Sequence, residues 1–200
     1  MKIIDIIFND LKKDKNIYYS LIAVLIISFV FGLLFITILK DSDKSLLINQ
    51  ISSYFESIKN GHKLDLLNVL FKNNGILLLI WILGFSIIGI PILICILFYK
   101  GFTLSFTVTS LIYTFKVDGI LLSFIYIFPH LILNILFYFI LTYYSFKLSL
   151  EFIYLLFNKK KFNTNYLKKY IIVLLISLVF ISISSIYETF IIPYLIKMIY

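Results

Sequence analysis

The length of the apolar runs constrains this chain more than any other feature. Residues 17–39 contain no charged side chain, and further predominantly apolar runs cover 75–99, 120–150 and 170–193. At a rise of 1.5 Å per residue, about 20 helical residues cross a hydrocarbon core of about 30 Å. A mean hydropathy of +1.04 is well above that of soluble domains. We therefore predict one all-α membrane domain, a polytopic helical bundle of about five transmembrane helices.

The charged residues are few and basic, with a formal net charge of +8, and every basic residue is a lysine. Without arginine the chain lacks the planar fork that binds phosphate and carboxylate in bidentate fashion. The lysines flank the apolar runs, which favours roles in topology and in contact with anionic lipid over nucleic-acid binding. The two histidines, His62 and His130, lie far apart in the sequence, and no zinc, phosphate-loop or nucleophile motif is present. We expect no enzyme activity, no metal site and no cofactor.

Two polar segments have helical periodicity. Residues 1–16 place isoleucines opposite lysines and predict a short interfacial helix on the cytoplasmic side. The 40–74 loop predicts two amphipathic extracytoplasmic helices, divided at Asn60-Gly61, which lie either on the membrane or on a partner. Its candidate partner-facing residues are Leu47, Ile51, Phe55, Phe71, Asn73 and Asn74.

The second half of the chain predicts three more crossings after 75–99. These are a short span at 101–117, a broken span at 120–150 interrupted near Pro129, and a last span at 170–193. A lysine-rich loop at 158–169 then shares the N-terminal side, which the positive-inside rule makes cytoplasmic. The alternative is a re-entrant hairpin at 101–128, which would place this loop outside.

Small residues and a proline interrupt the apolar sequence in the middle of the chain. Gly84, Ser86 and Gly89 predict close helix packing, within the chain or against a partner or second copy. Pro91 predicts a kink in the span, and Lys100 with Gly101 predicts a tight cytoplasmic turn.

Three polar residues fall inside predicted spans. His130 and Asn134 are four residues apart and share one helix face, and Glu188 is the lone acid of the last span. Such residues are costly in lipid and are candidates for function: a proton or ion relay for His130 and Asn134, and a partner contact or an ion site for Glu188. The structural reading is hydrogen bonding between helices for Asn134 and an interfacial position for His130 and Glu188.

The stretch "LFKNNGILLLIWILGFSIIGIPILICILFYKGFTLSF", with the later "DGILLSF…IFP" that contains Gly119 and Pro129, resembles the stage II sporulation protein M family. The resemblance covers most of the chain. Lys100 and the absence of an acid between Gly119 and Pro129 depart from the pattern expected in many members.

The resemblance implies a non-catalytic scaffold of the engulfment machinery in endospore formation. Its implied partners are stage II sporulation proteins D and P, the hydrolases that remodel septal peptidoglycan, and its implied location is the mother-cell membrane at the septum. The rival hypothesis is a small transporter or channel subunit, because broken helices and a short span also occur at transport sites.

Overall fold

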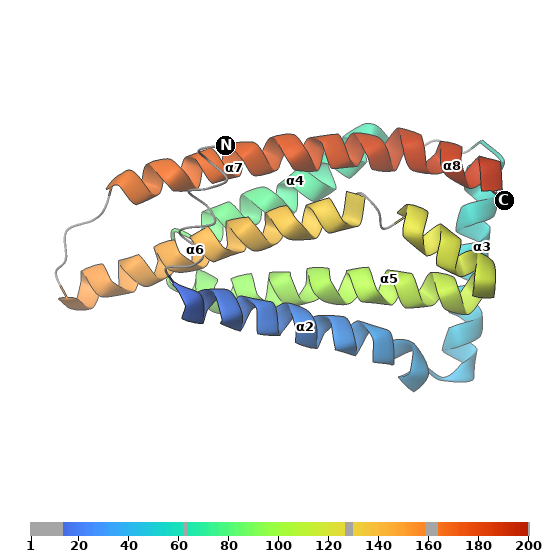
Figure 1. The fold of residues 1–200 in the computed structure, drawn as a ribbon, viewed down its shortest axis with the longest axis horizontal. Helices are drawn as coiled ribbons and strands as arrows, with labels where there is room; N and C mark the ends of the chain where they lie inside the picture. Colours follow the sequence, from blue (N-terminus) through green and yellow to red (C-terminus); the bar gives the residue numbers. More distant parts are fainter. Residues whose placement is uncertain (1–13, 62–63, 127–129, 159–163, 200) are drawn as a thin grey trace.

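The computed structural model describes residues 14–61, 64–126, 130–158 and 164–199. Five helical segments in these residues are long and apolar enough to cross a membrane, and they lie side by side along the long axis of the molecule (Figure 1). The predicted all-α membrane bundle is therefore confirmed. The expected interfacial helix at 1–16 falls almost wholly outside the described residues.

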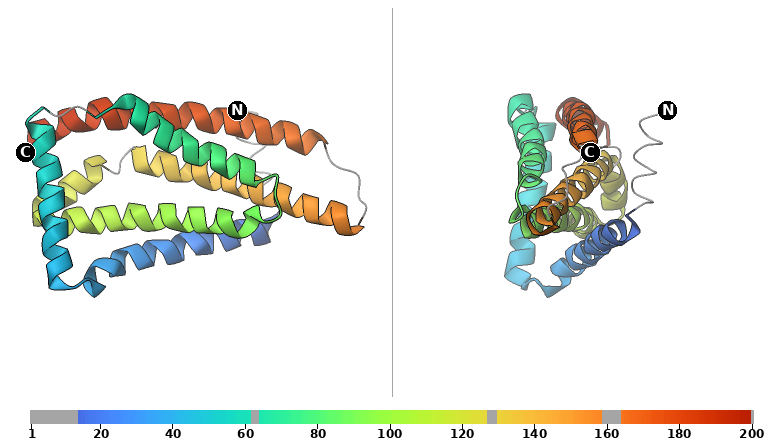
Figure 2. Two further views of the ribbon diagram at one scale, coloured as in Figure 1. Left: turned by 180° about the vertical axis from the view of Figure 1, so that it is seen from behind. Right: turned by 90° about the vertical axis from the view of Figure 1, so that its left-hand side faces the viewer.

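The chain runs back and forth between two ends of the bundle (Figures 1 and 2). Helix α2 (Lys15–Ile38) leads to α3 (Asp41–Lys59), which lies across the far end, and α4 (Leu66–Leu83) then returns. Helix α5 (Gly89–Tyr126) and helix α6 (Ile132–Asn158) form the next pair. The last segment consists of α7 (Thr164–Ile186), the π-helical turn η2 (Tyr187–Ile191) and α8 (Ile192–Ile199).

The helix boundaries differ from expectation within the apolar run 75–99. This run is not one span, because α4 ends at Leu83 and α5 starts at Gly89 in the opposite direction. The intervening turn needs no charged residue because Ser149 of α6 lies within hydrogen-bonding distance of the carbonyl oxygens of Gly84 and Ser86, at 3.1 and 3.0 Å. Backbone groups at a turn in an apolar region must be satisfied by the protein itself.

The small residues of this turn permit two close approaches. A Cβ on Gly84 would lie 3.0 Å from the Cα of Ser145, and a Cβ on Gly89 would collide with the carbonyl of Leu83. Both contacts are within the chain. Pro91 produces no kink, since it occupies the first turn of α5, where a missing N–H costs no helical hydrogen bond.

Lys100 and Gly101 also differ from expectation, because they lie within α5 and not in a turn. The chain instead reverses at Lys116, which has a positive φ of 52°, so that 117–126 folds back along the 89–115 arm. A Cβ on Gly119 would lie 2.8 Å from the Cα of Ile112, so only glycine allows this approach. The arm 117–126 and α6 together resemble the predicted broken fourth span, although Pro129 lies outside the described residues.

Helix α2 packs on α5 through a reciprocal pair of small-residue motifs. Ser28 and Gly32, four residues apart on α2, face Gly101 and Ser105, four residues apart on α5. The two serine hydroxyls donate to carbonyl groups of their own helices, so they add no unsatisfied donor to the interface. Small residues at this spacing let two transmembrane backbones approach closely.

We predict that Gly32→Ala destabilises the protein, whereas Gly75→Ala does not. A Cβ on Gly32 would meet the Ser105 hydroxyl and lie 2.6 Å from the carbonyl oxygen of Phe102, but a Cβ on Gly75 has nothing within 4 Å. Overpacking of this kind costs about 1–3 kcal/mol, while both changes gain helix propensity. Thermal unfolding in detergent measures the difference. Equal melting temperatures for the two variants would show that α2 and α5 do not pack as described.

Candidate functional site

A polar pocket of about 170 Å³ lies inside the bundle between α4, α5, α6 and η2. Polar and charged side chains from all four elements converge on it, although they are far apart in the sequence. We call this site the polar pocket. Its polar lining residues are Lys72, Asn73, Tyr99, Lys100, Thr103, Thr107, His130, Asn134, Tyr138 and Glu188.

Lys100 lies in the interior of the bundle. It is eleven residues, or about 16 Å, from the start of α5 at Gly89. Its Nζ lies 4.5 Å from the centroid of the Tyr138 ring. An ammonium over an aromatic face is attracted by the ring quadrupole, and this attraction grows when water is excluded. Tyr138 therefore provides part of the solvation that Lys100 lacks in the membrane.

Asn73 and Asn74 connect α4 to α7 and are not partner-facing. The Asn73 amide donates to the Ser185 hydroxyl at 3.0 Å, and the Asn74 amide donates to the Ser182 hydroxyl at 3.1 Å. The Tyr138 hydroxyl also donates to the backbone carbonyl of Asn73 at 2.9 Å. Hydrogen bonds between transmembrane helices of this kind contribute about 0.6–2 kcal/mol each.

Glu188 projects from η2, the single π-helical turn of the last span. The Asn73 amide donates to its Oε2 at 3.2 Å. Lys72 and Lys100 both lie close enough to interact with its charge, although neither is within ion-pair distance in the described chain. Single π-helical turns within α-helices are frequent at functional sites, because the extra residue re-aims neighbouring side chains.

His130 and Asn134 both line the polar pocket from the α6 side. His130 is buried, its ring stacks on Tyr187 with centroids 6.4 Å apart, and its backbone carbonyl accepts from Ser184 at 3.0 Å. Asn134 is 6% exposed, and its Oδ1 has no hydrogen-bond partner among the described residues. The buried amide of Asn134 is therefore not fully used by the protein.

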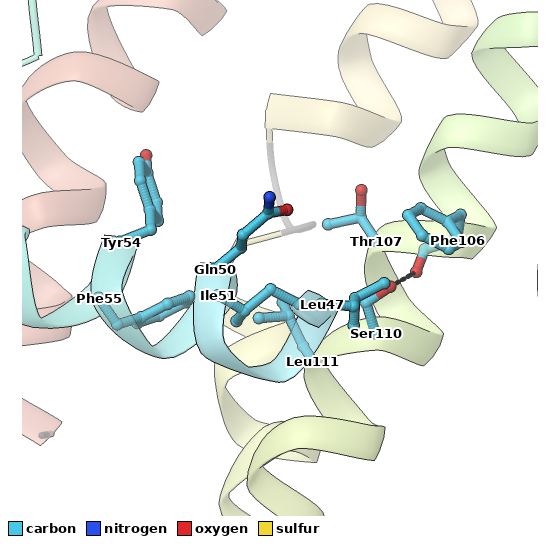
Figure 3. Close-up of a pocket in the computed structure, with 9 residues that line it drawn as sticks. All are labelled: Leu47, Gln50, Ile51, Tyr54, Phe55, Phe106, Thr107, Ser110 and Leu111. Atoms are coloured by element: carbon cyan, nitrogen blue, oxygen red, sulfur yellow. Dashed lines mark hydrogen bonds between the residues drawn. The ribbon is translucent and has the colours of Figure 1, made fainter. Parts of the chain in front are cut away.

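The other four loop residues expected to face a partner, apart from Asn73 and Asn74, divide into three groups. Phe55 is 3% exposed and packs against the ring of Phe115 at 5.1 Å, so it belongs to the core under α3 and not to a free surface. Leu47 and Ile51 line a second cavity of about 280 Å³ between α3 and α5 (Figure 3). Phe71 is 76% exposed on the outer face of α4.

Sequence reasoning missed the roles of Lys72 and Tyr138. The available signal was the pairing of two adjacent asparagines, Asn73 and Asn74, with the serine-rich stretch before Glu188, because amides inside a membrane need hydroxyl or carboxylate partners. The expected span at 75–99 hid this pairing, because it left the asparagines in a loop. Within the described residues, no three His, Cys, Asp or Glu side chains lie together as metal ligands would.

We predict that Asn73 and Glu188 are energetically coupled. Asn73→Ala removes a hydrogen bond to the carboxylate, and Glu188→Ala removes its acceptor, so the double variant loses this contact only once. We expect a coupling energy of about 0.5–2 kcal/mol from a double-mutant cycle on thermal stability in detergent. The matched control pairs Glu188→Ala with Asn68→Ala, since Asn68 is exposed and bonds only to Asp65. Strict additivity for both pairs would contradict the described contact.

Comparison with known proteins gives one match. A family model described as SpoIIM, stage II sporulation protein M, matches residues 21–193. No curated protein and no solved structure shows significant similarity to the chain. The matched region contains the whole polar pocket and helices α3 to α7. Because the match covers most of the chain, this protein belongs to the stage II sporulation protein M family and is a multi-pass membrane protein with a role in sporulation.

Proposed function

We propose that the protein is a non-catalytic membrane scaffold that holds peptidoglycan hydrolases at the sporulation septum during engulfment. Its partners in this proposal are stage II sporulation proteins D and P. Membership of the family supports the sporulation context. The single observation that carries the scaffold role is the position of α3, which lies across one end of the bundle as a platform (Figures 1 and 2).

The platform is held in place by its apolar face. Phe55 and Ile58 of α3 are buried against α5 and α8, in a cluster that contains Leu111, Ile192 and Ile196. Burial of one such side chain contributes about 1.5–3 kcal/mol. Because these contacts connect α3 to two helices of the bundle, the helix has a fixed orientation and not the freedom of a surface loop.

The opposite face of α3 is exposed and polar. This outward face provides hydrogen-bonding and charged groups for a partner, with acidic residues in the first turn and a single glutamate, Glu56, in the last turn. The exposed residues of α3 that do not line the cavity between α3 and α5 are Asp41, Ser42, Asp43, Ser45, Leu46, Asn49, Ser53, Glu56 and Lys59. The docking surface in our proposal is therefore this outward face and not the Leu47, Ile51 and Phe55 face.

The proposal places α3 outside the cytoplasm and the N-terminus inside it. The start of α2 and the start of α7 lie at the bundle end opposite α3 (Figure 1), and the lysines at 12–15 and 159–169 are adjacent to them in sequence. Lysine-rich segments close to membrane ends favour the cytoplasm. The α3 platform then faces the compartment that contains the cell wall.

We predict that Glu56→Lys reduces recovery of the hydrolase partners. The change reverses a charge on the outward face without touching the buried face, so the fold is retained while a complementary contact becomes repulsive. We expect at least a threefold loss in immunoprecipitation from sporulating cells. Lys168→Glu is the matched control, because Lys168 is an exposed lysine at the opposite end of the bundle. Unchanged recovery with Glu56→Lys, or equal loss with both variants, would count against α3 as the docking surface.

We predict that single cysteines report opposite sides of the membrane. In a Cys95→Ser background, Ser53→Cys on α3 should react with an impermeant maleimide added to intact cells, and Lys168→Cys should react only after permeabilisation. Both positions are exposed, so access depends on the side of the membrane. Labelling of position 168 in intact cells would reverse the orientation and remove α3 from the wall compartment.

A small transporter or channel subunit is the second candidate function. The polar pocket favours it, because a chamber with charged and amide side chains inside a bundle is typical of transport sites. This function requires solute movement across the bilayer, which proteoliposomes measure directly, whereas the scaffold role does not.

A further inference from the structure

We propose that the polar pocket binds one phosphate group between Lys72 and Lys100. The inference goes beyond the scaffold role and does not depend on it. It follows from the balance of charge in the pocket, the hydrogen bonds that its acid already makes, and the position of its lysines at an exposed rim.

The ionic side chains that line the pocket do not balance. They are two lysines, Lys72 and Lys100, and one glutamate, Glu188, so one positive charge is in excess. The two ammonium groups are close enough to repel each other. Because Lys72 is exposed at the rim, this excess positive charge is open to an anion that enters from outside the bundle.

The described part of the chain does not supply the missing counter-ion. The carboxylate of Glu188 accepts from the Asn73 amide at 3.2 Å, and no acid of the described chain lies within 4.0 Å of either lysine nitrogen. Lys100 instead contacts the face of Tyr138. Its ammonium has three donors, and an aromatic face satisfies at most part of them.

Asn134 is a second, uncharged group available to a ligand. Its side chain lines the same pocket, is 94% buried, and has an Oδ1 with no hydrogen-bond partner in the described residues. Burying an amide without its hydrogen bonds is costly. The two N–H donors of this amide make no hydrogen bond within the described residues either, and it is these donors, not the Oδ1 acceptor, that suit the oxygens of an oxyanion.

Size and access favour a phosphate group. The volume of about 170 Å³ is far larger than the ~10–15 Å³ that one water requires. Lys72 and Tyr99, which is 58% exposed, lie at the rim between α4 and α5 on the outer face of the bundle. A phosphodiester carries one negative charge, which equals the excess in the pocket, and phospholipids are the abundant anions next to this rim. Dissolved phosphate has the same chemistry, and the experiment separates the two sources.

The test uses the full-length protein and two probes. In the first arm, protein is reconstituted with a mixture of phosphatidylglycerol and phosphatidylcholine, extracted in mild detergent, and examined by native mass spectrometry for retained lipid. In the second arm, delipidated protein is titrated with sodium phosphate, with sodium chloride at matched ionic strength, while thermal unfolding is followed. Lys72→Gln and Lys100→Gln are the site variants. Lys197→Gln is the control, because Lys197 is an exposed lysine of α8 outside the pocket.

We expect one tightly retained phospholipid or a saturable thermal stabilisation by phosphate. Each site variant should weaken that binding at least tenfold, and Lys197→Gln should leave it unchanged. Retained lipid without a phosphate effect assigns the source as phospholipid, and the reverse assigns it as dissolved phosphate. Lys72 is exposed, so Lys72→Gln tests the site even if Lys100→Gln does not fold.

Three results would overturn the proposal. The first is wild-type protein with neither retained lipid nor phosphate stabilisation. The second is wild-type affinity in a folded Lys72→Gln variant. The third is saturable stabilisation by sodium or calcium chloride that disappears in Glu188→Gln, since the pocket would then be a cation site.

Discussion

The structure depends on one constraint: hydrocarbon offers no hydrogen-bond partner, so a polar group inside the membrane is stabilised mainly by partners within the protein. Asn73 illustrates the outcome. Its side chain donates to Ser185 and Glu188, and its backbone carbonyl accepts from Tyr138, so one residue connects α4 with α6, α7 and η2. The apolar surface of the bundle faces lipid and cannot by itself select which helices meet. In this chain the polar contacts make that selection.

A second set of contacts brings the helices close enough for this network to form. The serine and glycine pairs on α2 and α5 remove side-chain bulk where the two backbones meet. In the turn between α4 and α5, the Ser149 hydroxyl lies within hydrogen-bonding distance of the carbonyl oxygens of Gly84 and Ser86 and so stabilises the turn. Helix α6, which contains Ser149, Tyr138 and Asn134, is the most buried of the five spans and contributes to both the turn and the polar pocket.

The sequence predicts the fold class and the number of spans because these depend on total apolar length, and it predicts α3 because its period of three to four residues is strong. It does not reveal the turn at Gly84, since a reversal stabilised by Ser149, 65 residues later, leaves no polar loop in the sequence. Because the turn at Gly84 was not predicted, Lys100 was expected in a turn and Asn73 in a loop. The sequence alone therefore did not predict that these residues meet in the polar pocket. His130, Asn134 and Glu188 were recognisable because polar residues are rare in the spans, but their common location requires the tertiary structure.

The α2 and α5 interface also has a consequence for the order of synthesis. Gly32 leaves the ribosome about 70 residues before Gly101, and translation at ~5–20 residues per second separates them by several seconds. During that interval the Ser28 and Gly32 face of α2 has no α5 to pack on. Helix α2 must therefore be stable in the bilayer without its packing partner until α5 has been synthesised. Its 24 residues contain no acidic side chain and only one lysine, at its first position. This composition makes the helix stable in lipid on its own.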